Sequence, residues 1–128
     1  MKTIVTLSLF FLISYNFTYA QSEECLKNIR TGTFEYVTSG IKVTVIRTEN
    51  EQIELLNEGK SKAISKVRWI NNREYIITFV KSINLPGCLK EGDEMKMVIT
   101  ECNGNTYTTI GSSKRCGNAG ITITKIQN

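Results

Sequence analysis

Short runs of β-branched and aromatic residues alternate with turn residues at intervals of about ten along residues 25–126. Within the runs, apolar side chains recur at every second position, which is the period of a strand with one buried face. The pattern predicts strands at 33–38, 41–48, 51–57, 63–70, 74–83, 94–102, 105–112 and 121–126. Ser39-Gly40, Asn71-Asn72 and Asn103-Gly104 occupy positions where tight hairpins are expected.

The period-two pattern also predicts which side chains face inward. The expected inner pairs are Val43 and Val45, Val67 and Trp69, Ile77 and Phe79, Met97 and Ile99, and Ile121 and Ile123. On the fourth run the opposite face carries Lys66 and Arg68, which continue a basic stripe from Lys60 and Lys62. Such a stripe is ordinarily a solvated face or a protected edge, although it could also be a binding surface.

One segment has two interpretations. Thr48-Glu49-Asn50-Glu51 matches a helix capping box, Ile53 and Leu56 are three residues apart, and Gly59 could end a helix. A short helix over 49–58 is therefore an alternative to the third strand.

Eight consecutive strands joined by short turns predict an all-β fold, an antiparallel up-and-down meander. Closure into a small, calycin-like barrel would remove the unpaired edges, and a half-barrel is the less complete version. Residues 21–128 are enough for one domain with its own core and too few for two.

The first 20 residues predict export. A basic start (Lys2), an uncharged apolar stretch over 4–13 and a small residue at Ala20 are typical of a cleavable signal peptide. The apolar stretch is shorter than the roughly 20 residues that span a bilayer. Ser22-Glu23-Glu24 before Cys25 do not match a lipid-attachment signal. We expect a periplasmic or secreted product that is soluble after cleavage.

The four cysteines are expected to form two disulfides, because even numbers of cysteines in exported domains usually pair. In a meander, successive strands run in opposite directions, so Cys25 and Cys102 lie at one end, and Cys88 and Cys116 lie at the other. The sixth strand separates the two ends by roughly 25–30 Å, whereas a disulfide needs a Cα separation of about 4.4–6.8 Å. The predicted pairs are Cys25–Cys102 and Cys88–Cys116.

Several chemistries find no support in the sequence. There is no histidine, so the usual general base, the histidine-activated nucleophile and the imidazole metal site are absent. The wide cysteine spacing does not fit structural zinc. Glu91, Asp93 and Glu94 surround a turn glycine, where acids are ordinarily solvated. The basic residues are not clustered, which argues against nucleic acid. We expect no enzyme, cofactor or metal site.

Two residues in the inner phase could serve a site. Arg47 continues the phase of Val43 and Val45, so a regular strand would point it inward, where Gln52 and Glu54 could supply a partner. The preferred interpretation is that Arg47 sits at the strand end and reaches solvent. Trp69 could line a ligand pocket, but a tryptophan in phase with Val67 is more often part of the core.

The series Cys25, Gly32-Thr33-Phe34, Ile46-Arg47, Gln52-Ile53-Glu54, Val67-Arg68-Trp69-Ile70 and Tyr75 resembles a family of small exported or lipid-anchored β-domains of Bacteroidota-type bacteria. The resemblance covers about residues 25–80. That family has no assigned activity, so the resemblance implies no catalytic residues. It favours a strand over a helix at 51–57. Its members often carry a cysteine where this chain has Arg73, so Cys102 would take over as the partner of Cys25.

These observations favour a non-catalytic binding domain. The first hypothesis is a barrel that carries a small apolar ligand, because eight strands can just enclose one. The alternative is an envelope-associated or extracellular interaction or inhibitor domain, with the basic face of the fourth strand or the 88–92 loop as its contact surface. The residues that could line a ligand site or the core are Arg47, Gln52, Glu54, Trp69 and Tyr75.

Overall fold

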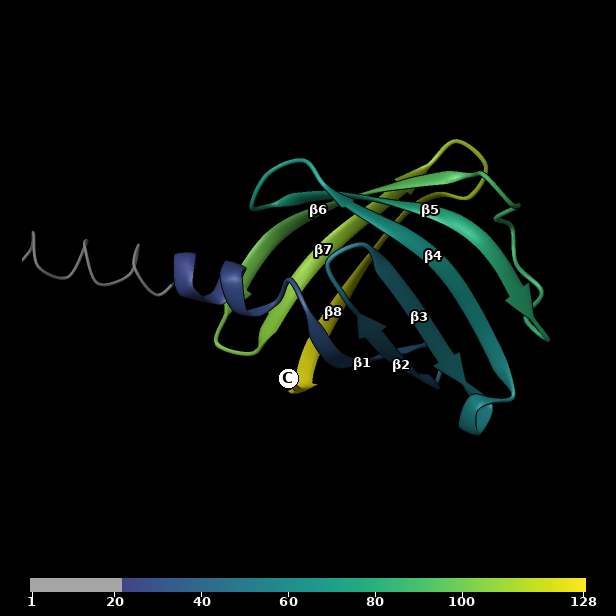
Figure 1. Cartoon of the computed structure of the whole chain (residues 1–128), viewed down its shortest axis with the longest axis horizontal. Coiled ribbons are helices and arrows are strands. Elements are labelled where there is room, and N and C mark those ends of the chain that lie inside the picture. Colours follow the sequence, from purple (N-terminus) through teal and green to yellow (C-terminus); the bar gives the residue numbers. More distant parts are fainter. Residues whose placement is uncertain (1–21) are drawn as a thin grey trace, which may run out of the picture.

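The computed structural model describes residues 22–128, and the expected signal peptide at 1–20 lies outside them. The described chain forms eight strands, each antiparallel to its neighbours (Figure 1). They are β1 (Gly32–Thr38), β2 (Ile41–Arg47), β3 (Glu51–Leu56), β4 (Ser61–Trp69), β5 (Glu74–Ile83), β6 (Glu94–Asn103), β7 (Thr106–Ser113) and β8 (Gly117–Gln127). A 3-10 turn, η1 (Asn57–Gly59), joins β3 to β4.

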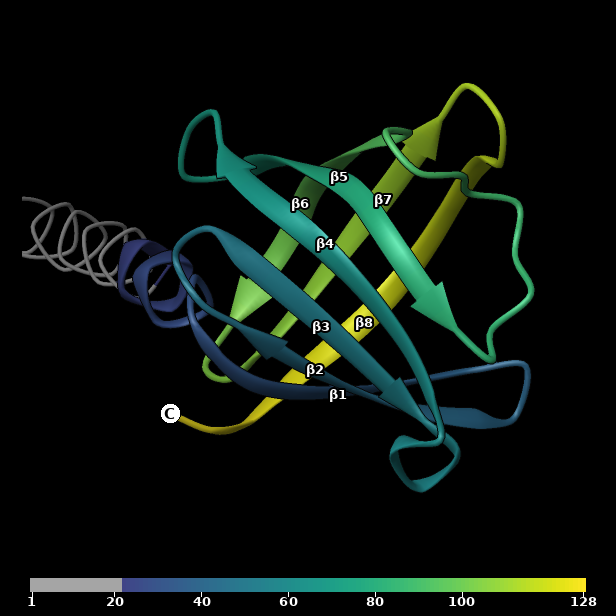
Figure 2. The same ribbon diagram turned by 45° about the vertical axis from the view of Figure 1, so that its right-hand side comes forward.

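The meander closes into a barrel because β1 pairs with β8 as well as with β2. Figure 2 shows β8 running beside β1 and the strands wrapping around a common interior. Closure gives each of the eight strands in residues 22–128 a hydrogen-bonded neighbour on both sides. The predicted all-β meander is therefore confirmed, in its barrel form.

The predicted inner face is the observed one. Val43, Val45, Val67, Met97, Ile99 and Ile123 are each at most 5% exposed, and Ile77 is 8% exposed. Trp69 and Ile121 are partly buried and pack against the same cluster. The outward phase of β4 carries the exposed Lys66 and Arg68, so the basic stripe is a solvated outer face.

The N-terminal segment holds a helix that the sequence pattern did not predict. Residues 22–28 are helical and lead through 29–31 into β1. Cys25, Leu26 and Ile29 are buried and belong to the barrel core. We call residues 22–29 the plug, because they close one end of the barrel. Two turns of helix are too short to give a clear 3.6-residue period, which explains the omission.

The helix alternative for 49–58 is wrong. Residues Glu51–Leu56 form β3, and only Asn57–Gly59 adopt a short 3-10 turn. The residues that match a capping box close a hairpin instead, since the Thr48 amide donates to the Glu51 carbonyl at 2.9 Å. Several strand boundaries also differ from expectation. β8 begins at Gly117 rather than 121, β4 begins at Ser61 rather than 63, and other strand ends differ by one residue. Gly104-Asn105 forms the β6–β7 turn in place of Asn103-Gly104.

Both predicted disulfides are present. Cys25–Cys102 has a Cα separation of 5.8 Å, and Cys88–Cys116 has one of 5.6 Å. They lie at opposite ends of the barrel. The closed end holds the plug, residues 48–50, 70–73 and 104–105, and the first disulfide. The open end holds residues 39–40, 57–60, 84–93 and 114–116, and the second disulfide. Residues 22–128 contain no helix long and apolar enough to cross a membrane.

Candidate functional site

A cavity of about 500 Å³ occupies the barrel interior between the polar cluster near the plug and the open end. This volume is within the range of small-molecule sites, about 300–1,000 Å³. Inward-facing side chains make an apolar wall, and the 84–93 loop adds an apolar rim. The apolar lining residues are Val45, Ala63, Ile77, Phe79, Leu85, Pro86, Leu89, Met95, Met97, Ile121 and Ile123.

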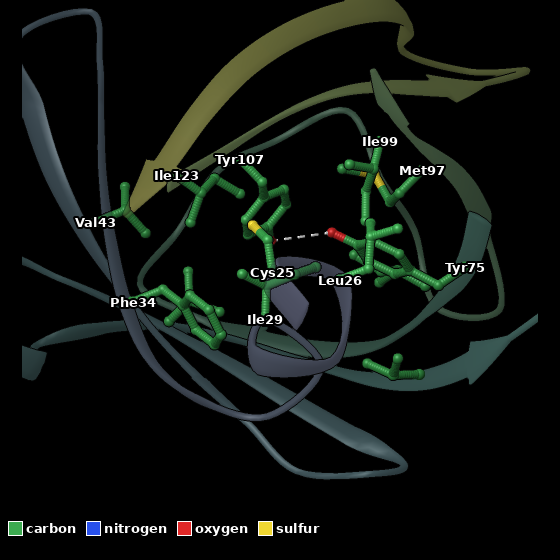
Figure 3. Close-up of a cluster of buried hydrophobic side chains, with 13 residues drawn as sticks. Cys25, Leu26, Ile29, Phe34, Val43, Tyr75, Met97, Ile99, Tyr107 and Ile123 are labelled. Carbon is green, nitrogen blue, oxygen red and sulfur yellow. Dashed lines mark hydrogen bonds between the residues drawn. The ribbon is translucent and has the colours of Figure 1, made fainter. Parts of the chain in front are cut away.

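The plug seals the other end of the interior. Figure 3 shows Cys25, Leu26 and Ile29 lying among Phe34, Tyr75 and Tyr107. Ile29 and Phe34 are fully buried, and the Phe34 and Tyr107 rings meet edge to face with centroids 6.1 Å apart. All six of these side chains are at most 5% exposed, so packed side chains fill the closed end.

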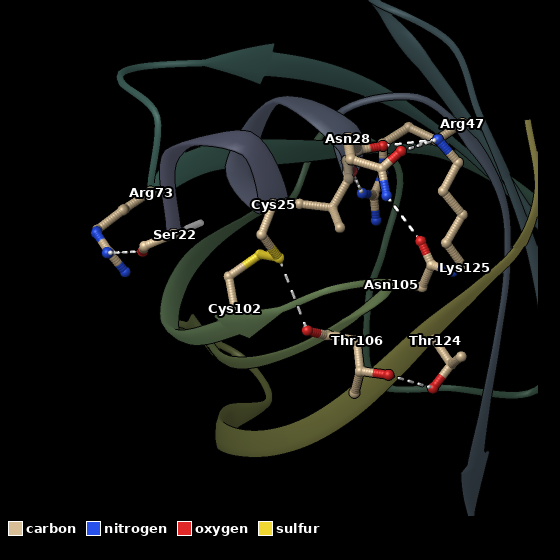
Figure 4. Close-up of a disulfide and its surroundings, with 11 residues drawn as sticks. Ser22, Cys25, Asn28, Arg47, Arg73, Cys102, Asn105, Thr106, Thr124 and Lys125 are labelled. Atoms are coloured by element: carbon tan, nitrogen blue, oxygen red, sulfur yellow. Dashed lines mark hydrogen bonds between the residues drawn. A yellow bond between two sulfur atoms is a disulfide. The ribbon is translucent and has the colours of Figure 1, made fainter. Parts of the chain in front are cut away.

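Polar contacts fasten the plug to strands that are distant in sequence (Figure 4). Lys125 Nζ donates to the Asn28 carbonyl at 2.7 Å, and Asn28 Nδ2 donates to Asn105 Oδ1 at 2.9 Å. Arg73 Nη2 donates to Ser22 Oγ at 3.2 Å. Together with the Cys25–Cys102 disulfide, these bonds join the plug to β6, β8 and two turns.

Arg47 is the centre of a buried polar cluster between the plug and the cavity. It is 2% exposed, and its guanidinium makes four hydrogen bonds. Nε donates to Gln52 Oε1 at 2.9 Å and Nη1 donates to the Ile29 carbonyl at 3.0 Å. Nη2 donates to the hydroxyls of Tyr107 at 2.8 Å and Tyr75 at 3.4 Å.

Three aromatic rings surround the same guanidinium. Its central carbon lies 4.8, 5.0 and 5.8 Å from the ring centroids of Phe34, Tyr75 and Tyr107. Burial alone would lower the pKa of Arg47, but the nearby Tyr75 and Tyr107 hydroxyls and the Glu54 carboxylate outweigh burial and raise it. Arg47 therefore stays charged, with its charge distributed over oxygen acceptors and π faces.

Glu54 lies one inward position beyond Gln52 on β3, and its carboxylate lines the cavity. Oε1 accepts hydrogen bonds from the Tyr36 hydroxyl at 3.2 Å and from Gln52 Nε2 at 3.4 Å. Burial raises the pKa of Glu54, and the Tyr36 hydrogen bond and the Arg47 charge offset only part of that rise. Gln52 thus bridges a buried cation to a carboxylate at the cavity wall.

The structure brings together four of the five residues singled out from the sequence: Arg47, Gln52, Glu54 and Tyr75. The preferred expectation that Arg47 reaches solvent is wrong, because the plug covers the strand end where the side chain would otherwise escape. Trp69 belongs to the core, as preferred. Its ring packs against that of Tyr75, tilted by 36° with centroids 4.5 Å apart, and the Arg30 guanidinium carbon lies over the Trp69 ring, 4.7 Å from its centroid. Trp69 does not line the cavity.

Sequence reasoning missed Tyr36, Tyr107 and Ile29. Tyr36 is in phase with Phe34 on β1, so the two-residue period could have placed it inside. Tyr107 comes from a strand 60 residues beyond Arg47, and the Ile29 carbonyl comes from the unpredicted plug. No local pattern identifies either as a partner of Arg47.

The acidic turn near the open end has a structural role. Asp93 pairs with Arg115 at 2.7 Å, which lowers the pKa of Asp93, and its carboxylate also accepts from the Lys90 amide. Over residues 22–128, no group of three or more histidine, cysteine, aspartate or glutamate side chains is arranged to hold a metal ion.

The fold and the interior together define a closed eight-stranded antiparallel barrel with a plugged end and an internal cavity. Comparison of the chain with models of known protein families, with curated proteins and with solved structures gave no match. The similarity to exported Bacteroidota-type β-domains stays a prediction.

Proposed function

We propose that the protein is exported and acts as a non-catalytic carrier of a small apolar ligand, which occupies the barrel interior. The observation that carries this proposal is the cavity of about 500 Å³, apolar along its wall and adjoining a polar cluster. A cavity of this size and lining is the usual form of a small-molecule site. The two disulfides fit an oxidising compartment, which supports export.

The polar residues of the site are better suited to binding than to catalysis. Each guanidinium nitrogen of Arg47 donates to a neighbouring group, and Glu54 has no histidine or second carboxylate beside it on the cavity lining. Glycosidase-type chemistry needs a pair of carboxyl groups facing one reaction centre. A single carboxylate at the wall of an apolar cavity instead orients a ligand.

Two measurements test the carrier function. Native mass spectrometry of gently purified protein is expected to show an added mass that organic extraction removes. An uncharged, environment-sensitive dye, N-phenyl-1-naphthylamine, is expected to brighten with the extracted protein. Absence of any added mass, with no response to the dye or to apolar probes, would contradict the proposal.

A cavity-filling pair of variants locates the binding. Ile121 lines the cavity, whereas its neighbour Thr122 is exposed on the outer face. We expect Ile121→Trp to reduce ligand occupancy and dye binding by at least about tenfold, because the indole takes up ligand space. Thr122→Trp adds the same group outside the barrel and should bind normally. Equal binding by both variants would place the ligand elsewhere.

The interaction-domain alternative has weaker support. The basic stripe on β4 is not uniformly positive in its surroundings, since the acidic Glu51 is the cross-strand neighbour of Lys66. The 84–93 loop is fastened by the Cys88–Cys116 bond and contributes Leu85, Pro86 and Leu89 to the cavity rim, so it is not a free protrusion. Protein capture by the ligand-free barrel, abolished in Lys66→Glu/Arg68→Glu, would favour this alternative.

A further inference from the structure

One oxygen of Glu54 is left without a partner. Oε1 accepts the two hydrogen bonds from Tyr36 and Gln52, while Oε2 accepts none from residues 22–128. Among residues 22–128, the side-chain polar atom that is fully buried without a partner is Trp69 Nε1 alone. Glu54 Oε2 also lacks a partner, so it is not fully buried and must border open space. The open space that Glu54 borders is the cavity.

Arg47 does not neutralise this carboxylate directly. No Arg47 nitrogen lies within 4.0 Å of a Glu54 oxygen, and Gln52 stands between the two side chains. The four guanidinium hydrogen bonds go to Gln52, the Ile29 carbonyl, Tyr75 and Tyr107. Arg47 is thus committed to holding the plug and the tyrosines, and is poorly placed to bind an anionic ligand.

The remaining charge on the cavity lining belongs to Glu54. Apart from Arg47, it is the one charged side chain among the described residues that line the cavity. An ionised carboxylate removed from bulk water is costly unless it is paired. A ligand that supplies a cation to Oε2 would provide that pairing, whereas a ligand carboxylate would face repulsion at the same point.

Resting on the proposed carrier function, we propose that the ligand is an apolar molecule bearing an amine, whose ammonium group donates a hydrogen bond to Glu54 Oε2. The apolar body lies along the wall formed by Val45, Ile77, Met97 and Ile123. The selectivity arises because a charge-assisted hydrogen bond in a site shielded from water is stronger than a neutral one.

The test uses three probes with the same alkyl chain: decylamine, decanol and decanoate. Isothermal titration calorimetry at neutral pH is expected to show decylamine binding about 10–100-fold more tightly than decanol, the range of one charge-assisted hydrogen bond. Decanoate should bind most weakly. Glu54→Gln should bring decylamine to within about threefold of decanol, with decanol itself little changed.

Glu51→Gln is the matched control, because Glu51 is on the same strand but exposed on the outer face. It should retain the full preference for the amine. Glu54→Asp keeps the charge and should retain part of the preference, which separates loss of the carboxylate from general damage to the barrel.

The outcomes separate the two proposals. Equal binding of all three probes, tighter binding of decanoate, or an unchanged amine preference in Glu54→Gln would overturn the amine assignment while leaving the carrier function intact. Binding of none of the probes, together with no response to the dye, would overturn both.

Discussion

Arg47 links three parts of the molecule through one side chain. Its guanidinium binds the plug through the Ile29 carbonyl, β3 through Gln52, and the far wall of the barrel through Tyr75 and Tyr107. Removal of the guanidinium would take this donor from the Gln52 side chain and the Ile29 carbonyl, and would leave the Tyr75 and Tyr107 hydroxyls paired with each other at 3.3 Å. Deleting one member of a buried charged cluster is costly because its partners stay behind in the core. This holds even where replacing the whole cluster by apolar residues would cost little.

We expect Arg47→Met to lower the free energy of unfolding by about 3–5 kcal/mol, since the partners that remain are buried. Urea unfolding followed by circular dichroism measures the change. Arg68→Met is the control, because Arg68 is exposed on the outer face of β4; it should change stability by less than about 0.5 kcal/mol. Similar values for the two variants would mean that the Arg47 cluster contributes little.

Glu54 gives stability a pH dependence with a definite sign. Burial raises the pKa of Glu54 in the folded protein above 4.5, the ordinary value for a glutamate side chain. The Tyr36 hydrogen bond and the Arg47 charge offset part of this rise. The groups that face it are Tyr36 on β1, Arg47 on β2 and Tyr75 on β5. The folded state therefore holds the Glu54 proton more tightly than the unfolded state.

Its contribution to stability is fully present below the unfolded pKa and is lost as pH rises through the raised folded pKa. We expect the difference in free energy of unfolding between wild type and Glu54→Gln to decline with pH from about 4 upward and then level off. Urea titrations across that range measure it. Glu51→Gln keeps Glu54, so its free energy of unfolding relative to that of Glu54→Gln should show the same decline. A difference between wild type and Glu54→Gln that does not change with pH would refute the assignment.

At this scale the sequence predicted part of the site. Arg47, Gln52 and Glu54 could be grouped because they are inward positions on adjacent strands joined by a short turn. The burial of Arg47 could not be predicted, because a charge at a strand end normally reaches water and only the plug prevents it here. Tyr107 is brought near by barrel closure, which no local pattern encodes.

Among the elements, the plug depends most on contacts with distant residues. Its helical part, 22–28, is shorter than an isolated helix that would be stable in water. Its conformation is maintained by burial of Cys25, Leu26 and Ile29, by the Lys125 and Arg73 hydrogen bonds, and by the disulfide to Cys102. Tertiary packing, not helix propensity, keeps it in place.

We expect Cys25→Ser/Cys102→Ser to lower the free energy of unfolding by about 2–5 kcal/mol, because the bond closes a segment with a sequence separation of 77. Hydrogen exchange should increase most over residues 22–31, where the tether is lost. In Cys88→Ser/Cys116→Ser, exchange over the same residues should stay slow. Fast exchange at the plug in both double variants would show that the first disulfide does not hold it.

The strands were predicted well because each shows the period-two pattern and is bounded by turn residues. The N-terminal part of β8, 117–120, was not predicted, because Gly117, Ala119 and Gly120 have low strand propensity. These residues are in the strand because they pair with residues 110–113 of β7. At 49–58 the capping-box match was misleading, because its hydrogen-bonding side chains serve equally well in a tight turn.

At the scale of the whole described barrel, residues 22–128, the cavity extends to the open end. The plug and its disulfide seal the closed end, and the 84–93 loop, held by Cys88–Cys116, borders the other. A ligand that reaches the Arg47–Gln52–Glu54 cluster must pass this loop. Exchange of the ligand should therefore depend on how firmly the loop is fixed.

We expect Cys88→Ser/Cys116→Ser to speed ligand dissociation several-fold, because the rim of the cavity loosens. The preference for decylamine over decanol should be nearly unchanged, because Glu54 is untouched. Stopped-flow displacement of N-phenyl-1-naphthylamine measures the rate. Cys25→Ser/Cys102→Ser, assayed below its unfolding temperature, is the comparison at the opposite end. Faster dissociation only in the latter would place the entry route at the plug.

Global topology was accessible from the sequence through two independent constraints. Eight strands with short turns favour closure, because an open sheet would leave two edges unpaired. The parity of strand directions then fixed which cysteines share an end, and both pairs formed as predicted. The cavity itself could not be predicted, since the same pattern of inward apolar residues fits a completely filled interior.

The pairing of β1 with β8 has a consequence for the order of folding. Thr33 meets Gln127 and Lys125 binds Asn28, so the first and last elements depend on one another. A chain that ends before β8 would have the edges of β1 and β7 exposed, both able to pair with other chains. The native barrel can close only after β8 is available. Until then the unfinished sheet is vulnerable to aggregation, and such long-range pairing is intrinsically slow.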